Sequence, residues 1–94
     1  GHVDEVGTVQ KISLEGNSII LTISYTKDLK KYIVVKGSIT VNGVSLTVIG
    51  TSSNNFTVGI IPYTWKHTMF HTLKVSDQLN LEADILAKYI WQKI

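Results

Sequence analysis

The sequence predicts an all-β protein, a small antiparallel barrel of about six strands followed by a short C-terminal helix. Short runs rich in β-branched and aromatic residues recur along the chain, as is typical of strands. Turn dipeptides, Gly16-Asn17 and Asn42-Gly43, separate these runs. Only the last segment changes to a helical period. A small sheet has two edges to hide, and closure into a barrel removes both.

The first third of the chain predicts two strands and one helical turn. Residues 3–13 alternate loosely and end near the Gly16-Asn17 turn. Residues 19–25 are β-branched and aromatic, and so predict the second strand. Thr26 is placed to cap a helical turn over residues 28–32.

The middle of the chain predicts a tight hairpin. Residues 39–41 and 44–48 flank Asn42-Gly43, which suits a type I′ turn because both central residues need a positive φ. The alternation places the apolar residues at 44, 46 and 48 on one face. It places Ser45 and Thr47 on the other.

A polar loop at 51–55 precedes a strand at 56–61, which Pro62 ends because proline cannot donate to a strand ladder. Residues 64–69 predict a short helical turn, and 75–78 predict a turn before the last strand at 79–83.

The tail predicts a helix, because apolar and amphipathic residues recur at helical spacing. These are Leu86, Tyr89, Ile90 and Lys93. Asp84 stands just before them and suits an N-cap.

Composition limits the classes of function. The 94 residues predict one domain, 1–94, and the absence of Cys excludes disulfides and cysteine zinc sites. All nine basic residues are Lys and the net charge is +2, which weighs against nucleic acid and membrane surfaces as partners. With no initiator Met, we expect a piece of a longer protein. Gly1-His2 is either native or a cloning remnant.

Few residues suggest chemistry on their own. His67 and His71 have a spacing that could hold a metal on a helix, but no third ligand is evident, so two surface histidines are favoured and no metal site is predicted. The face with Ser45 and Thr47 is either a solvated strand face or a polar ligand surface that binds a heterocycle or polyol.

Four spaced motifs resemble the lumazine-binding repeat of the riboflavin synthase family. The run Lys36–Val48 is similar to one of them, and Gly1-His2-Val3-Asp4 is similar to the opening of the second repeat. Ile61-Pro62-x-Thr64 with Thr68 resembles an Ile-Pro-x-Thr-x-x-x-Thr segment, and 79–89 resembles the Val-Asn-Leu-Glu-x-Asp-Ile-Leu-Ala-Lys-Tyr ending.

The resemblance implies a six-stranded Greek-key barrel that is the second of two repeats in a trimeric cytoplasmic enzyme. It implies dismutation of two molecules of 6,7-dimethyl-8-ribityllumazine into riboflavin and a ribityl-diaminopyrimidine, by transfer of a four-carbon unit without cofactor or metal. Each active site would lie between this repeat and the N-terminal repeat of a neighbouring subunit. The isolated second repeat would then be nearly inactive.

The resemblance also implies site residues. His2, Ser45 and Asp84 are the candidates for proton transfer or nucleophilic addition. The implied substrate contacts are Gly1, His2, Val3, Lys36, Ser45, Leu46, Thr47, Gly59, Ile60, Ile61, Pro62, Tyr63 and Thr64. The chain departs from the family pattern at Tyr63, where Glu is usual, and at 69–71, where Thr-Leu-Gly is usual.

Two other interpretations stay open. One is a non-catalytic lumazine- or flavin-binding antenna protein, whose relatives tend to lose the ligand-site residues of the second repeat. Ser45, Thr47 and Thr64 are kept here. The other is a small oligonucleotide-binding barrel, which would need an aromatic stacking platform and a basic groove.

Overall fold

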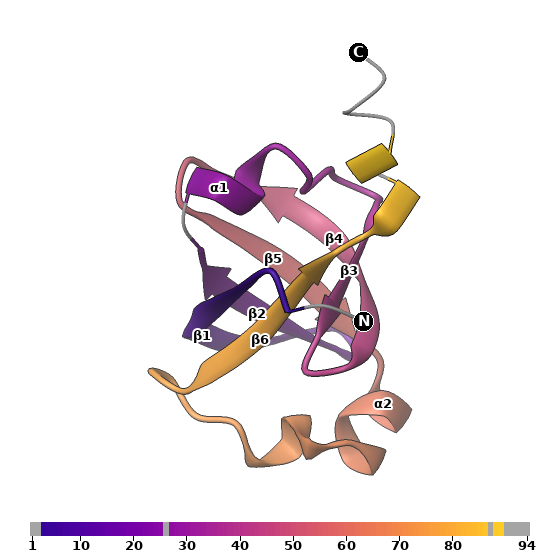
Figure 1. Ribbon diagram of the computed structural model, residues 1–94. Helices are drawn as coiled ribbons and strands as arrows, with labels where there is room; N and C mark the ends of the chain where they lie inside the picture. The colour runs from indigo at the N-terminus through magenta and orange to yellow at the C-terminus, as the bar shows by residue number, and fades with distance from the viewer. Residues whose placement is uncertain (1–2, 26, 87, 90–94) are drawn as a thin grey trace.

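The computed structural model describes residues 3–25, 27–86 and 88–89, and within them six antiparallel strands close into a barrel (Figure 1). The order around the barrel is β1-β2-β5-β4-β3-β6, a Greek-key arrangement, as predicted. The strands are β1 (Glu5–Glu15), β2 (Ser18–Ser24), β3 (Ser38–Val41), β4 (Val44–Thr51), β5 (Asn55–Ile60) and β6 (Gln78–Ala83).

The two turn dipeptides lie where the sequence predicts them. Asn42 and Gly43 have φ values of 47° and 85°, so both central residues of the β3–β4 turn are left-handed, as a type I′ turn requires. Gly16, with φ of 61°, begins the turn between β1 and β2. The two-residue turn fixes the β3–β4 register, which pairs Thr40 with Ser45 and Ser38 with Thr47.

Alternate strand residues fill the barrel interior. In β2, every second residue is buried, and the matching positions of β5 pack against them. The largest fully buried side chains are Phe56, Phe70, Leu21, Ile23, Ile39, Ile60, Leu79 and Leu81. Gly7 lies where β1 crosses closest to its neighbours: a Cβ there would come within 2.7 Å of Ile23 Cγ2 and Leu81 Cδ1.

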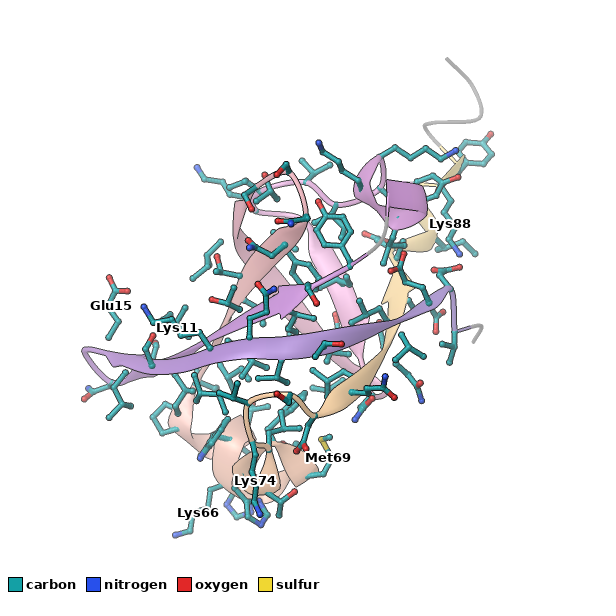
Figure 2. The ribbon with its side chains drawn as sticks, turned by 90° about the vertical axis from the view of Figure 1, so that its left-hand side faces the viewer. Lys11, Glu15, Lys66, Met69, Lys74 and Lys88 are labelled. Carbon is teal, nitrogen blue, oxygen red and sulfur yellow. The ribbon has the colours of Figure 1, made fainter. Side chains whose placement is uncertain are left out.

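Helical segments cover both ends of the barrel. α1 (Lys27–Lys30) lies at one end, and α2 (Pro62–His67) and η1 (Met69–Thr72) lie at the other (Figure 1). Figure 2 shows Lys66, Met69 and Lys74 at the α2 end and Lys88 at the opposite one.

The helical boundaries differ from the sequence predictions. α1 ends at Lys30 rather than continuing to Tyr32, although the Tyr32 amide still donates to the Leu29 carbonyl at 3.0 Å. α2 begins at Pro62 rather than Thr64, because proline without an N–H is well suited to the first helical position. The predicted Thr26 cap lies outside the described residues.

The chain turns helical again after β6. The backbone is helical at 85–86 and 88–89, and the Lys88 amide donates to the Asp84 carbonyl at 3.2 Å. Asp84 Oδ1 accepts from the Leu86 amide at 3.0 Å, which confirms the predicted N-cap. Ile90 and Lys93 of the predicted helix lie outside the described residues. Over the part of the chain described, no helix has the length and apolar character needed to cross a membrane.

Candidate functional site

A patch of hydroxyl groups covers the outer face of β3 and β4. Ser38 and Thr40 on β3 lie directly opposite Thr47 and Ser45 on β4. Cross-strand neighbours have Cβ atoms about 4.5–5.5 Å apart, so the four hydroxyls form a compact group. We call Ser38, Thr40, Ser45 and Thr47 the hydroxyl patch. None of these hydroxyls hydrogen-bonds to another residue in the described part of the chain, so they are available to a ligand.

Two carboxylates border the hydroxyl patch. Glu82 pairs with Thr40 across the β3–β6 ladder, and Asp84 follows immediately after β6. A hollow of about 370 Å³ opens between them and the patch. Its lining residues are Ser38, Ile39, Thr40, Ser45, Glu82, Ala83, Asp84 and Ile85. Ser45 and Asp84, two of the residues proposed for chemistry, therefore line one hollow.

Asp84 has one oxygen committed to the fold and one available. Its Oδ1 caps the helical turn through the Leu86 amide, and Oδ2 makes no hydrogen bond to another described residue. A carboxylate oxygen accepts hydrogen bonds from alcohols, and hydroxyls both donate and accept. The hollow is therefore suited to a polyhydroxylated ligand.

At the opposite border of the hydroxyl patch, Gly59 has no side chain to project above the strand. Gly59 on β5 pairs with Thr47, and a Cβ built there meets only Ile49 Cγ2, at 3.9 Å. The β4–β5 ladder ends at this pair. Ser45 and Ile61 therefore lie beyond the last β4–β5 pair, where a flat ring could pair its edge with backbone groups.

The segment after β5 leads from this border into α2. Ile61 is 59% exposed and Tyr63 is 69% exposed, whereas Thr64 is half-buried. The Tyr63 ring lies against the His67 ring, with 4.2 Å between centroids. Thr68 Oγ1 donates to the Thr64 carbonyl at 2.6 Å, which fixes the end of this turn. Pro62, as the first residue of α2, is exposed.

Leu46 and Ile60 are placed differently from the other implied contacts. Their side chains point into the core, with 7% and 1% exposure. They can therefore offer a ligand little beyond their backbone. Lys36 is exposed, and its amide donates to the Val48 carbonyl at 2.7 Å. Pairing with β4 therefore continues to a residue that precedes β3.

The start of the chain is held beside Asp84. The Asp4 amide donates to the Leu81 carbonyl at 2.8 Å, and Asp4 Oδ2 accepts from the Ala83 amide at 2.7 Å. Lys88 Nζ donates to Asp4 Oδ1 at 2.6 Å. Val3 is 57% exposed beside this junction, and Gly1 and His2 lie outside the described residues.

Sequence reasoning missed several of these residues. Ser38, Thr40 and Glu82 line the same hollow as Ser45 and Asp84 but were not singled out. The signal for the first two was present, because a two-residue turn at Asn42-Gly43 already implies their pairing with Thr47 and Ser45. Asp4 as a positioning residue had no local signal.

His67 and His71 belong to two different helical segments. His67 ends α2, and His71 lies in η1 with its Nδ1 2.5 Å from the Thr68 carbonyl oxygen. Among residues 3–25, 27–86 and 88–89, no three His, Asp or Glu side chains are grouped so that they could hold a metal ion.

The closed Greek-key barrel with a hydroxyl-rich hollow on its outer face defines a class: a small β-barrel domain with a polar hollow on its surface. Comparison with known families identifies the particular family within this class. The sequence model of the lumazine binding domain matches residues 1–84. The chain belongs to this family.

Known proteins give the same result. The chain is 44% identical to riboflavin synthase of Actinobacillus pleuropneumoniae over 92 residues, which are 98% of this chain and 43% of that protein. It is 35% identical to riboflavin synthase of Bacillus subtilis (strain 168), again over 98% of this chain and 43% of that protein. The chain thus spans less than half the length of these relatives.

Solved complexes of LumP are among the structures that resemble the chain. The LumP complex with riboflavin superposes with a TM-score of 0.79 at 30% identity, covering 86% of this chain and 44% of LumP. The complex with 6,7-dimethyl-8-(1'-D-ribityl) lumazine also gives 0.79, at 29% identity, covering 87% and 46%. The complex with flavin mononucleotide gives 0.80 at 28% identity, covering 90% and 48%.

Proposed function

We propose that this chain is the second of two lumazine-binding repeats of a riboflavin synthase and binds 6,7-dimethyl-8-ribityllumazine on the hydroxyl patch. The observation that carries the proposal is the hollow itself. Two carboxylates line it, together with hydroxyls that make no hydrogen bond to another described residue, in a chain that belongs to the lumazine-binding family. A ribityl chain is a polyol, so it offers donors and acceptors that match these groups.

The hollow and the Gly59 border of the hydroxyl patch have different tasks in this proposal. Ser45, Thr47 and the carboxylates of Glu82 and Asp84 hydrogen-bond the ribityl hydroxyls. The flat ring lies over Gly59, where the missing side chain leaves room, and its edge pairs with backbone beyond the end of the β4–β5 ladder. Ile61 packs against the ring because it is apolar and exposed at this border.

The catalytic part of the proposal rests on Ser45 and Asp84, together with His2 at the start of the chain. The reaction removes a proton from the methyl group attached to ring carbon 7. It also adds a nucleophile at ring carbon 7. Asp84, whose Oδ2 makes no hydrogen bond to another described residue, lines the hollow together with Ser45, so it can accept a proton there. Asp4 keeps the start of the chain next to Asp84.

The second lumazine has to come from another repeat. Two stacked ligands must be held in register, which supplies much of the rate through proximity. This chain supplies one surface, and the N-terminal repeat of a neighbouring subunit supplies the other, in a cytoplasmic trimer. The isolated chain is therefore expected to form riboflavin orders of magnitude more slowly than the whole enzyme. Addition of the first repeat is expected to restore part of the rate.

Fluorescence titration with the ribityllumazine and with riboflavin tests the binding half of the proposal. Thr47→Ala is expected to weaken binding about tenfold, by the loss of one to two hydrogen bonds. Thr51→Ala is the matched control, because Thr51 is exposed at the far end of the same strand. No saturable change for either ligand at high micromolar concentration would refute the assignment.

Kinetics of the full-length protein test the catalytic half. Asp84→Ala is expected to lower kcat more than it raises KM, whereas Thr47→Ala mainly raises KM. The likeness to LumP complexes with riboflavin and with the lumazine supports binding of these ligands, and a second candidate is a protein that binds them without turning them over. Tight binding by the full-length protein with no riboflavin formed would favour that candidate.

A further inference from the structure

One edge of β1 has no partner strand. β1 pairs with β2 as far as Glu15, but its pairing with β6 stops at Thr8. The last backbone hydrogen bonds on that edge join Val9 to Ser76 and Asp77. Along residues 10–15, in the part of the chain described, no element other than β2 supplies a backbone hydrogen bond. We call residues 10–15 the β1 edge. An open strand edge is a template for another strand.

Apolar side chains lie on one face of the β1 edge. Leu14 pairs with Ile19 yet is 77% exposed, and β1 has no second partner strand at this point because its pairing with β6 ends at Thr8. Ile12, Leu14, Ile19 and Trp65 line a hollow of about 400 Å³ together with Ser13. A leucine this exposed beside an apolar hollow and an open edge indicates a surface that another chain covers.

Opposite charges lie on the other face of the β1 edge. Lys11, Ser13 and Glu15 alternate with Ile12 and Leu14, and Figure 2 shows Lys11 and Glu15 projecting from the same side of the strand. In an antiparallel pairing of two such edges centred on Ser13, Lys11 lies opposite Glu15 of the second copy. Ile12 then lies opposite Leu14 of the second copy. Each of these pairs occurs twice by symmetry.

We propose that the β1 edge binds a second copy of this chain, by antiparallel strand pairing centred on Ser13. The segment is complementary to itself in both charge and apolar contacts, which is what a two-fold symmetric interface requires. The pairing satisfies the open backbone groups, covers Leu14 and joins the two apolar hollows next to Trp65.

This interface is independent of the proposed ligand site. The hydroxyl patch lies on β3 and β4, which one and two strands, respectively, separate from β1 around the barrel, so neither strand of the patch adjoins β1. The inference goes beyond the proposed function. Its failure would leave ligand binding untouched, and loss of binding would leave the pairing untouched.

Sedimentation velocity over a concentration series tests the proposal on the 94-residue chain. We expect a reversible monomer–dimer equilibrium. Lys11→Glu and Glu15→Lys should each weaken it about tenfold or more at low salt, because each places like charges opposite one another twice. Lys30→Glu, on the exposed last residue of α1, is the matched control for Lys11→Glu because it changes the net charge equally, and it should leave the equilibrium unchanged.

Mixing the two charge variants gives the decisive result. Lys11→Glu and Glu15→Lys chains should associate with each other about as tightly as the unchanged chain associates with itself, because every opposed pair again carries opposite charges. Leu14→Ser should weaken association without lowering the melting temperature at concentrations where the chain is monomeric, since Leu14 is already exposed in the single chain. A monomer at every concentration, or a dimer indifferent to these charge changes, would overturn the proposal.

Discussion

Removing the Asp4 carboxylate is expected to destabilise the fold by about 2 kcal/mol, although Asp4 lies near the beginning of the chain. Its Oδ2 accepts from the Ala83 amide at 2.7 Å, and its Oδ1 accepts from Lys88 Nζ at 2.6 Å. These bonds join Asp4 to Ala83 and Lys88, which follow it by 79 and 84 positions in the sequence. They hold the junction where β6 ends and the Asp84-capped turn begins.

The two bonds are expected to contribute unequally. A hydrogen bond to a charged group contributes about 1.5–3 kcal/mol, and the Ala83 amide would lose its acceptor. The ion pair joins side chains that are 22% and 28% exposed, so solvent screening limits it to about 0.5 kcal/mol. Asp4→Ala is therefore expected to cost about 2 kcal/mol, Asp4→Asn about 1 and Lys88→Ala about 0.5.

Urea unfolding followed by tryptophan fluorescence measures these free energies. For a domain of this size, about 2 kcal/mol corresponds to a fall in Tm of about 8–16 °C. The order of the three variants matters more than the absolute values. If Lys88→Ala costs as much as Asp4→Ala, or if Asp4→Ala stays within about 0.5 kcal/mol of the unchanged chain, the Ala83 bond does not hold this junction.

Three further changes have defined outcomes. Burial, and then the charge of Glu5, raise the pKa of Tyr25 above 10.0, so the folded state keeps this proton longer and loses stability as pH rises above that value. Tyr25→Phe, which is expected to be about 1 kcal/mol less stable at neutral pH, should lose this difference as pH rises above 10.0 in urea unfolding, and a constant difference would contradict the cause. Gly7→Ala should cost about 1–3 kcal/mol of unfolding free energy, because its Cβ would meet the Ser24 carbonyl oxygen at 2.7 Å; an unchanged Tm would disprove the close crossing. Gly59→Val should keep or raise the Tm but abolish ligand binding in titration, since the space above Gly59 is open, and normal affinity would exclude the ring from that position.

Local chemistry allowed much of the fold to be predicted. Asn42-Gly43 favours positive φ at both positions, which fixes the turn and the β3–β4 register. The alternation over 44–48 correctly predicted that Leu46 faces the core and that Ser45 and Thr47 face outward. That same alternation limits the Leu46 contact implied by family resemblance to the backbone.

Longer-range features could not be predicted in this way. β4 continues to Thr51 through a register shift between Val48 and Gly50, which depends on how β5 fits against it. The start of α2 was not predicted correctly, because Pro62 not only ends the preceding strand but also begins the helix. Glu82 joins the hollow only because β6 pairs with β3, about 40 residues earlier in the chain, and local patterns carry no information on that pairing.

The central claim is that the hydroxyl patch is the surface on which the ribityllumazine binds. Amide chemical shifts followed by NMR during titration with this ligand test it most directly. The account predicts saturable shifts at Thr40, Ser45, Thr47, Gly59 and Asp84, with none along the β1 edge. Shifts confined to α2 and η1, or to the β1 edge, would contradict it and place the ligand elsewhere on the barrel.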